Sequence, residues 1–202
     1  MNNGTVLWLV VFAVLAVLFL LTLRRLSVLV RRTHDLERYQ KLVRQLDKRL
    51  GQVADPFLTQ LDEIRRRSGD PRTLGGSIGA VQDTLRAISA DGRAARVPKG
   101  LAREAAAFAV ELDRAVRAGD LVEHGLDALL ADRGGRDLEA QTSLKRGALN
   151  LRHAREAVTR LSSEIAAVRP ADLRDRTDAA VRSTQGATVA TYLVDDDADA
   201  RR

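Results

Sequence analysis

The chain has 202 residues, of which 45% are hydrophobic and only 3% aromatic, and its formal net charge is +6. It contains no cysteine, which excludes disulfides, thiolate catalysis and cysteine-based metal sites. The shortage of aromatic residues argues against nucleic-acid binding, because such surfaces stack bases on exposed rings. Only four prolines occur, and Ala, Leu and Arg are abundant, so the composition favours an all-α protein.

Residues 6–23 are apolar throughout, with Thr22 as their one polar member. As a helix they would span about 27 Å, close to the ~30 Å hydrocarbon core of a bilayer. A cleaved signal peptide is the alternative, but residues 1–5 carry no basic side chain and Arg24-Arg25 does not resemble a cleavage site. We therefore predict a retained transmembrane helix over residues 6–23.

The two flanks of this segment differ in charge. No Lys or Arg precedes it, whereas four arginines follow it closely: Arg24, Arg25, Arg31 and Arg32. The positive-inside rule then places the C-terminal side in the cytoplasm and residues 1–5 outside. We predict that these arginines contact anionic lipid headgroups, each contributing about 1 kcal/mol near the surface. The excess of Arg over Lys suggests a GC-rich bacterial genome, so the predicted location is the inner (cytoplasmic) membrane.

A heptad pattern follows over the basic juxtamembrane segment 24–54. Apolar residues recur there at alternating steps of three and four, with Arg32 as the only gap: Leu29, Leu36, Tyr39, Val43, Leu46, Leu50 and Val53. This seam predicts a helix that packs either within the chain or against a second copy as a homodimer. Asp55-Pro56 predicts a break in the helix, with a kink as the alternative because the seam keeps its phase beyond it.

Residues 56–168 are predicted to form a helical bundle whose helices are separated at Gly and Pro. A loop is expected at 68–76, and the helix after it should end in a turn at Asp91-Gly92. The next helix should begin at Pro98 and end at Gly119. A short helix should then begin with a capping box at Asp120 and Glu123 and end at 134–135. The longest of these helices should run from Asp137 to Val168, where Pro170 stops it. The predicted fold is therefore all-α: one N-terminal transmembrane helix that continues into a cytoplasmic antiparallel bundle.

The C-terminal end has a different composition. A weak helix is expected over 169–182, and a disordered acidic tail over 183–202. Inside that tail, residues 189–194 form a short apolar patch, and aspartates follow it directly. The candidate partner-binding residues are Tyr192, Leu193, Val194, Asp195, Asp196 and Asp197. Packing of the patch back onto the chain's own bundle is the alternative.

The sequence offers little catalytic chemistry. His34 with Glu37, and His153 with Glu156, share helix faces, but their order is the reverse of the Glu-x-x-His pairs of di-iron bundles, and supporting glutamates are absent. His124 stands alone. Nucleophile signatures are missing, and the glycine-rich stretch 75–79 lacks the Lys of a phosphate loop. We therefore predict no catalytic residue, no metal and no cofactor.

Together these features indicate a non-enzymatic, single-pass membrane-anchored helical scaffold or interaction protein on the cytoplasmic face. Its partners would be the membrane and a protein that the sequence does not identify, with no nucleic acid. Two alternatives stay open. One is an accessory subunit of a larger membrane complex, and the other is a metal-binding or enzymatic bundle that uses His153 and Glu156.

Overall fold

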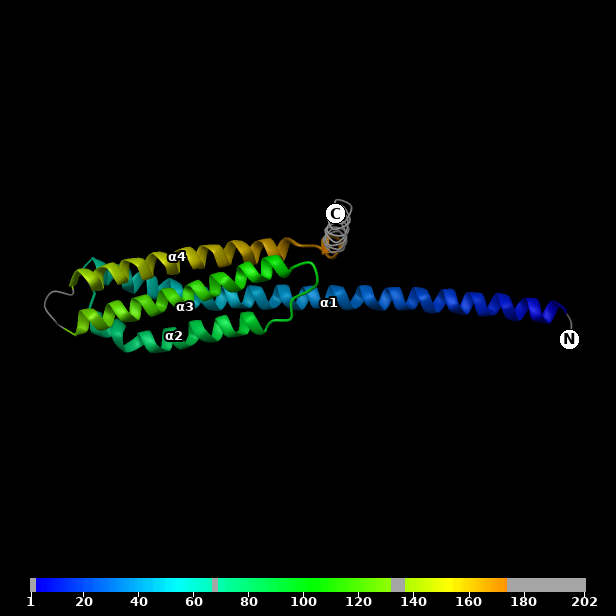
Figure 1. Ribbon diagram of the computed structural model, residues 1–202, viewed down its shortest axis with the longest axis horizontal. Helices are drawn as coiled ribbons and strands as arrows, with labels where there is room; N and C mark the ends of the chain where they lie inside the picture. The colour runs from blue at the N-terminus through cyan, green and yellow to red at the C-terminus, as the bar shows by residue number, and fades with distance from the viewer. Residues whose placement is uncertain (1–2, 67–68, 132–136, 174–202) are drawn as a thin grey trace, which may run out of the picture. The chain divides into compact units, whose positions relative to one another are not determined.

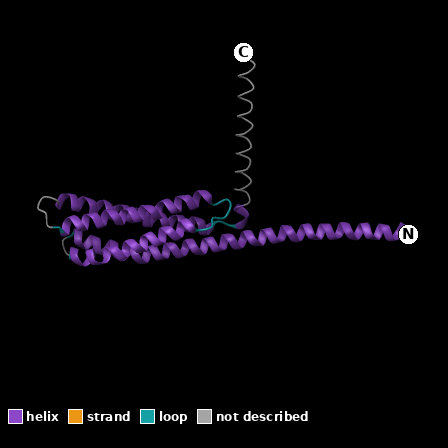
Figure 2. Cartoon of the chain, turned by 60° about the horizontal axis from the view of Figure 1, so that its bottom comes forward, coloured by secondary structure: helices purple, strands orange, loops and turns teal. Residues whose placement is uncertain are grey.

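The computed structural model describes residues 3–66, 69–131 and 137–173. Within these ranges it contains four long helices and no strand: α1 (Asn3–Arg65), α2 (Pro71–Ala94), α3 (Ala102–Leu130) and α4 (Asp137–Ala167) (Figures 1 and 2). The chain divides into two compact units, Met1–Arg38 and Tyr39–Arg202. The first part of α1 belongs to one unit, and the rest of α1 belongs to the other together with α2, α3 and α4.

The second unit is an antiparallel four-helix bundle. Each helix pairs with the next one along the chain, and α4 returns to α1. The contacts that establish this ring are Arg49 to Asp91 at 2.6 Å, Arg93 to Asp113 at 2.6 Å, His124 to Glu139 at 3.8 Å, and the Gln40 amide to the Ile165 carbonyl at 3.0 Å. Figures 1 and 2 show these helices side by side. The predicted all-α antiparallel bundle is therefore confirmed.

The heptad seam of α1 lies in the core of this bundle. Tyr39, Leu46 and Leu50 are buried, as are the matching seam residues of α4, including Leu151 and Val158. The seam departs from the prediction at one step, because Ala54 is fully buried and Val53 is only half-buried. Packing within one chain thus accounts for the burial of this part of the seam. A homodimer through the heptads stays a prediction that nothing here tests.

The predicted break at Asp55-Pro56 is wrong, because α1 continues through Pro56 to Arg65. Proline lacks the N–H of a normal helical bond, so the helix loses one backbone hydrogen bond there. The flanking seam residues Ala54 and Phe57 are 0% and 2% exposed. Their burial in the core stabilises the helical conformation on both sides of the proline and outweighs the lost bond.

The predicted ends of α2 are also wrong. The helix begins at Pro71, where the Arg72 backbone N–H donates to Asp70 Oδ1 at 2.9 Å, and it runs through Gly75 and Gly92 to Ala94. A Cβ on Gly92 would lie 2.6 Å from a Leu112 methyl group, and one on Gly75 would lie 2.9 Å from a Leu130 methyl group. Both glycines therefore make room for leucines of α3, and they do not mark turns.

The predicted helix end at Gly119 is wrong for the same reason, since this glycine of α3 makes room for a side chain of a neighbouring helix. The helix starts at Ala102, after the left-handed Gly100 (φ 93°), and continues through Gly119 to Leu130. A Cβ on Gly119 would meet the Gln82 amide, whose carbon would lie 2.8 Å away. The predicted capping box at Asp120 is therefore wrong, because Asp120 lies inside α3. Its carboxylate instead accepts hydrogen bonds from Gln82 and from Arg86 of α2.

The prediction for α4 is confirmed to within one residue, since the helix spans Asp137–Ala167 and Pro170 follows it. Residues 170–173 are helical, in agreement with the start of the weak helix expected over 169–182. The remainder of that segment, the predicted close at 134–135 and the tail 183–202 lie outside the described residues.

Candidate functional site

Large apolar side chains project from the first part of α1. Five of them are 56–73% exposed: Phe12, Leu15, Val17, Phe19 and Leu20. Phe12, Leu15 and Phe19 share one face of the helix at steps of three and four, whereas Val17 and Leu20 lie on another face. These five residues therefore lie on more than one face, which differs from the one-sided apolar stripe of a bundle helix.

Among the residues that the structure describes, no helix meets the length and hydropathy needed to cross a membrane. The side chains of most residues in the predicted span 6–23 lie outside the described set. The same is true of the four juxtamembrane residues Arg24, Arg25, Arg31 and Arg32. Their predicted contacts with lipid headgroups stay predictions. So does the role of the candidate partner-binding residues Tyr192 to Asp197.

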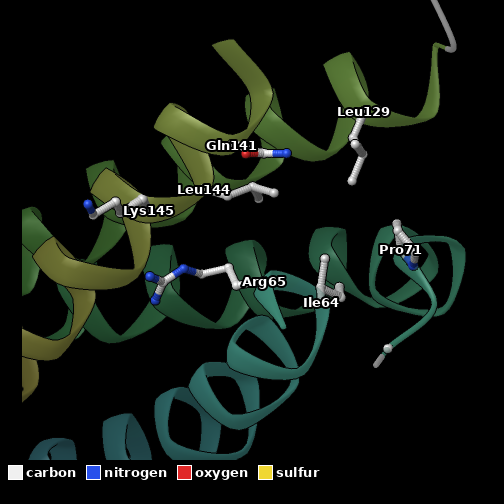
Figure 3. Close-up of a pocket in the computed structure, with 8 residues that line it drawn as sticks. Ile64, Arg65, Pro71, Leu129, Gln141, Leu144 and Lys145 are labelled. Carbon is white, nitrogen blue, oxygen red and sulfur yellow. The ribbon is translucent and has the colours of Figure 1, made fainter. Parts of the chain in front are cut away.

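A groove opens at the end of the bundle where α1 ends, α2 begins, α3 ends and α4 begins (Figure 3). Its volume is about 470 Å³, and we call it the end groove. It is lined by Ile64, Arg65, Gly69, Pro71, Leu129, Gln141, Leu144 and Lys145. Figure 3 shows Ile64 and Leu129 pointing toward each other across it. No local pattern in the sequence indicates this site, because its residues come together only where four helix ends converge.

Basic side chains surround the apolar part of the end groove. Arg65 lines it and also lines a smaller polar hollow of about 310 Å³, together with Asp62, Arg66 and Arg152. Asp62 accepts one contact from Arg65 and one from Arg152, each at 3.1 Å. The residues that line both hollows therefore include four cationic side chains and one carboxylate, so the lining carries an excess of positive charge.

Other polar groups in the bundle hold helices together. Arg155 of α4 contacts Asp47 of α1 at 2.6 Å. On the opposite side, Asp113 of α3 accepts from Ser89 at 2.5 Å and from Arg93 at 2.6 Å. Partial burial alone would raise the pKa of Asp113, but these hydrogen bonds and the positive charges nearby outweigh it and hold the pKa below its usual value.

Two further polar side chains, Gln82 and Tyr39, are packed between helices. Gln82 is buried, and its amide nitrogen donates to Asp120 while its carbonyl oxygen has no partner. Burial raises the pKa of the Tyr39 hydroxyl, and the negative charge of Glu104 raises it further. Neither group lines the end groove, so both are explained by packing between helices.

The histidines lie on the outside of the helices. His34 faces Glu37 at 3.8 Å with both side chains more than 60% exposed, and His153 and Glu156 are exposed on α4. His124 contacts Glu139 of α4 at 3.8 Å. Within the described residues, no group of three or more His, Asp or Glu side chains is placed to hold a metal ion.

Comparison with protein-family models, with curated proteins and with solved structures finds no match to this chain.

Proposed function

We propose that this protein is a non-enzymatic, membrane-anchored helical interaction protein. Its first helix would cross the bacterial inner membrane once, with the N-terminus outside and the bundle in the cytoplasm. The observation that carries the proposal is the set of large apolar side chains exposed on the first part of α1, represented by Phe12, Leu15 and Phe19.

The free energy of hydration supports this reading. Transfer of a large apolar side chain from water to an apolar environment contributes about 1.5–3 kcal/mol. Several such residues on more than one face would together favour a hydrocarbon environment strongly, and only helices and closed barrels satisfy their backbone there. The arginines at 24, 25, 31 and 32 would then lie beside the cytoplasmic headgroups and fix the orientation.

The bundle supports an interaction role. Its core is filled by aliphatic side chains such as Leu50 and Val158, and the polar pairs between its helices are structural. The end groove combines an apolar lining with an excess of positive charge. Association with a partner inside the bilayer, as in an accessory subunit, would cover the same apolar faces of α1.

Carbonate extraction of membranes tests the anchor. The full chain should stay in the membrane pellet. The double variant Leu15→Arg with Phe19→Arg should be released, because each arginine near the centre of a membrane helix costs about 2.5–3.5 kcal/mol. The matched control is Leu138→Arg with Leu149→Arg, which places the same charges at two exposed leucines of α4 and should stay in the pellet.

A reporter fused after Arg202 tests the orientation. A reporter that works only in the cytoplasm should be active, and one that works only in the periplasm should be silent. Activity of the periplasmic reporter would contradict the proposed topology. Release of the unmodified chain by carbonate would contradict the membrane anchor itself.

A further inference from the structure

The end groove presents two kinds of chemistry side by side. Leu129 supplies a half-buried apolar side chain beside the buried Ile64 and Leu144, and Lys145 and Arg65 supply positive charge at the edge of the groove. Gln141 adds an exposed side-chain amide that can pair with a peptide backbone. The adjoining polar hollow extends the charge through Arg66 and Arg152. An occupant that fits this surface has a short apolar stretch followed immediately by several carboxylates.

The chain itself contains one segment of that chemistry, outside the described residues. Residues 189–194 read Val-Ala-Thr-Tyr-Leu-Val, and aspartates occupy positions 195, 196, 197 and 199 directly after them. The apolar part matches the apolar lining of the groove in character, and the aspartates match the excess of cations in sign. Complementary charges of this kind favour one partner and one register over others.

The length of the chain is sufficient for the segment to reach the groove of the same molecule. From the end of α4 at Ala167 back to Leu144, the path along the helix is about 35 Å at ~1.5 Å per residue. Residues 174–191 can span up to about 60 Å when extended. A tethered segment also has an effective concentration near the millimolar range, which favours binding within one molecule over binding between molecules.

We propose that the end groove is the docking site for the chain's own C-terminal segment. Tyr192, Leu193 and Val194 bind between the helix ends, and Asp195 to Asp197 face Lys145, Arg65 and Arg152. The bound segment covers the end groove, so an external partner that binds there must displace it. This inference does not depend on the membrane anchor.

Disulfide trapping in the full chain tests the proposal directly, because the natural sequence has no cysteine. The test pair is Thr191→Cys with Gln141→Cys, which leaves the three apolar residues of the segment intact. The position control pairs Thr191→Cys with Leu149→Cys, an exposed site two turns further along α4 and closer to the origin of the segment. Under mild oxidation, the test pair should form an intramolecular disulfide about tenfold faster than the control pair, which corresponds to a modest preference for the groove.

A matched pair of charge reversals tests the electrostatic part. Lys145→Glu should slow trapping of the test pair by about three- to fivefold, the range expected for an exposed ion pair. Arg146→Glu is the control, because it changes the net charge equally at the neighbouring position, which does not line the groove. Thermal melts of both variants confirm that the bundle is intact.

Each remaining outcome overturns the proposal. Equal trapping rates at Gln141 and Leu149 would mean that the segment has no preference for the groove. Trapping that yields mainly dimers would assign the groove to the tail of a second copy. Equal effects of Lys145→Glu and Arg146→Glu would remove the charge complementarity on which the register rests.

Discussion

The two parts of α1 place the same kinds of side chain in opposite environments. Phe12 and Leu15 in the first unit are 73% and 59% exposed, whereas Leu46 and Leu50 in the second unit are 1% and 0% exposed. In the second part, apolar residues recur at steps of three and four and leave the other faces polar. In the first part they occupy more than one face. The spacing of the apolar residues therefore decides whether a stretch of helix joins a bundle, and hydrophobicity alone does not.

The polar positions of α1 reinforce this difference. In the second part, Arg49 contacts Asp91 of α2, and Asp47 contacts Arg155 of α4, each at 2.6 Å. These pairs flank the buried seam and set the register of the neighbouring helices. The corresponding stretch of the first part, residues 6–23, contains no charged residue that could make such a pair.

The largest expected effect comes from truncating one leucine in each part. Leu46→Ala should lower the free energy of unfolding of the bundle by about 2–5 kcal/mol, because it leaves a cavity in a closed core. Leu15→Ala should change it by less than about 0.5 kcal/mol. Thermal melts of the full chain in detergent measure both. Equal stability of the two variants would break the comparison, because it would mean that the seam of α1 is not part of the bundle core.

A second test compares glycines inside the bundle, and its expected effect is intermediate. A Cβ on Gly147 would lie 2.6 Å from Val122 Cγ2 and 2.9 Å from the Ala118 carbonyl oxygen, so Gly147→Ala should destabilise the bundle by about 1–3 kcal/mol. Gly79 has no neighbour within 4 Å, and Gly79→Ala should stabilise the bundle by about 0.5–1 kcal/mol through helix propensity.

Both glycine variants can be followed by denaturant unfolding of the full chain. A Gly147→Ala variant at least as stable as the unmodified chain would contradict the close approach of α3 and α4 at Gly147. Effects of opposite sign would sharpen the comparison between packed and unpacked parts of a helix. They would show that contacts with a neighbouring helix outweigh the intrinsic helix propensity of the residue at Gly147.

The smallest expected effect concerns acid stability of the second unit. The pKa of Asp113 is lower in the folded chain than its ordinary value of about 4. Its contribution to stability is therefore present above that ordinary value and is lost as the pH falls through the folded pKa. Asp113→Asn should destabilise the bundle by about 1 kcal/mol at neutral pH, and the difference from the unmodified chain should shrink in acid.

The matched control for this effect is Asp127→Asn, at an exposed carboxylate on the same helix. It should change stability by less than about 0.5 kcal/mol. The difference in melting temperature between the Asp113→Asn variant and the unmodified chain should shrink in acid. An equal difference at neutral and acid pH would contradict the assigned role of Asp113.

Helix content, the antiparallel arrangement and the bounds of α4 followed from the sequence, because long apolar seams with period 3.5–3.6 predict helices, and the chain has only four prolines to interrupt them. The seam kept its phase across Asp55-Pro56, which favoured a kink as the alternative, but the break that we predicted there is wrong and α1 continues. The apolar segment 6–23 and the arginines after it are likewise readable from residue type alone.

The helix ends inside the bundle and the position of the end groove were decided only by tertiary structure. Gly92 and Gly119 are read as turn residues in isolation, but here they lie where a leucine and a glutamine of neighbouring helices need the space of a side chain. Glycine in a helix costs about 1 kcal/mol relative to alanine, and burial of the surrounding apolar residues stabilises the helix by more than that. The groove arises where Ile64, Leu129 and Leu144 from three helices converge, and residues so far apart in the chain share no local pattern that would connect them.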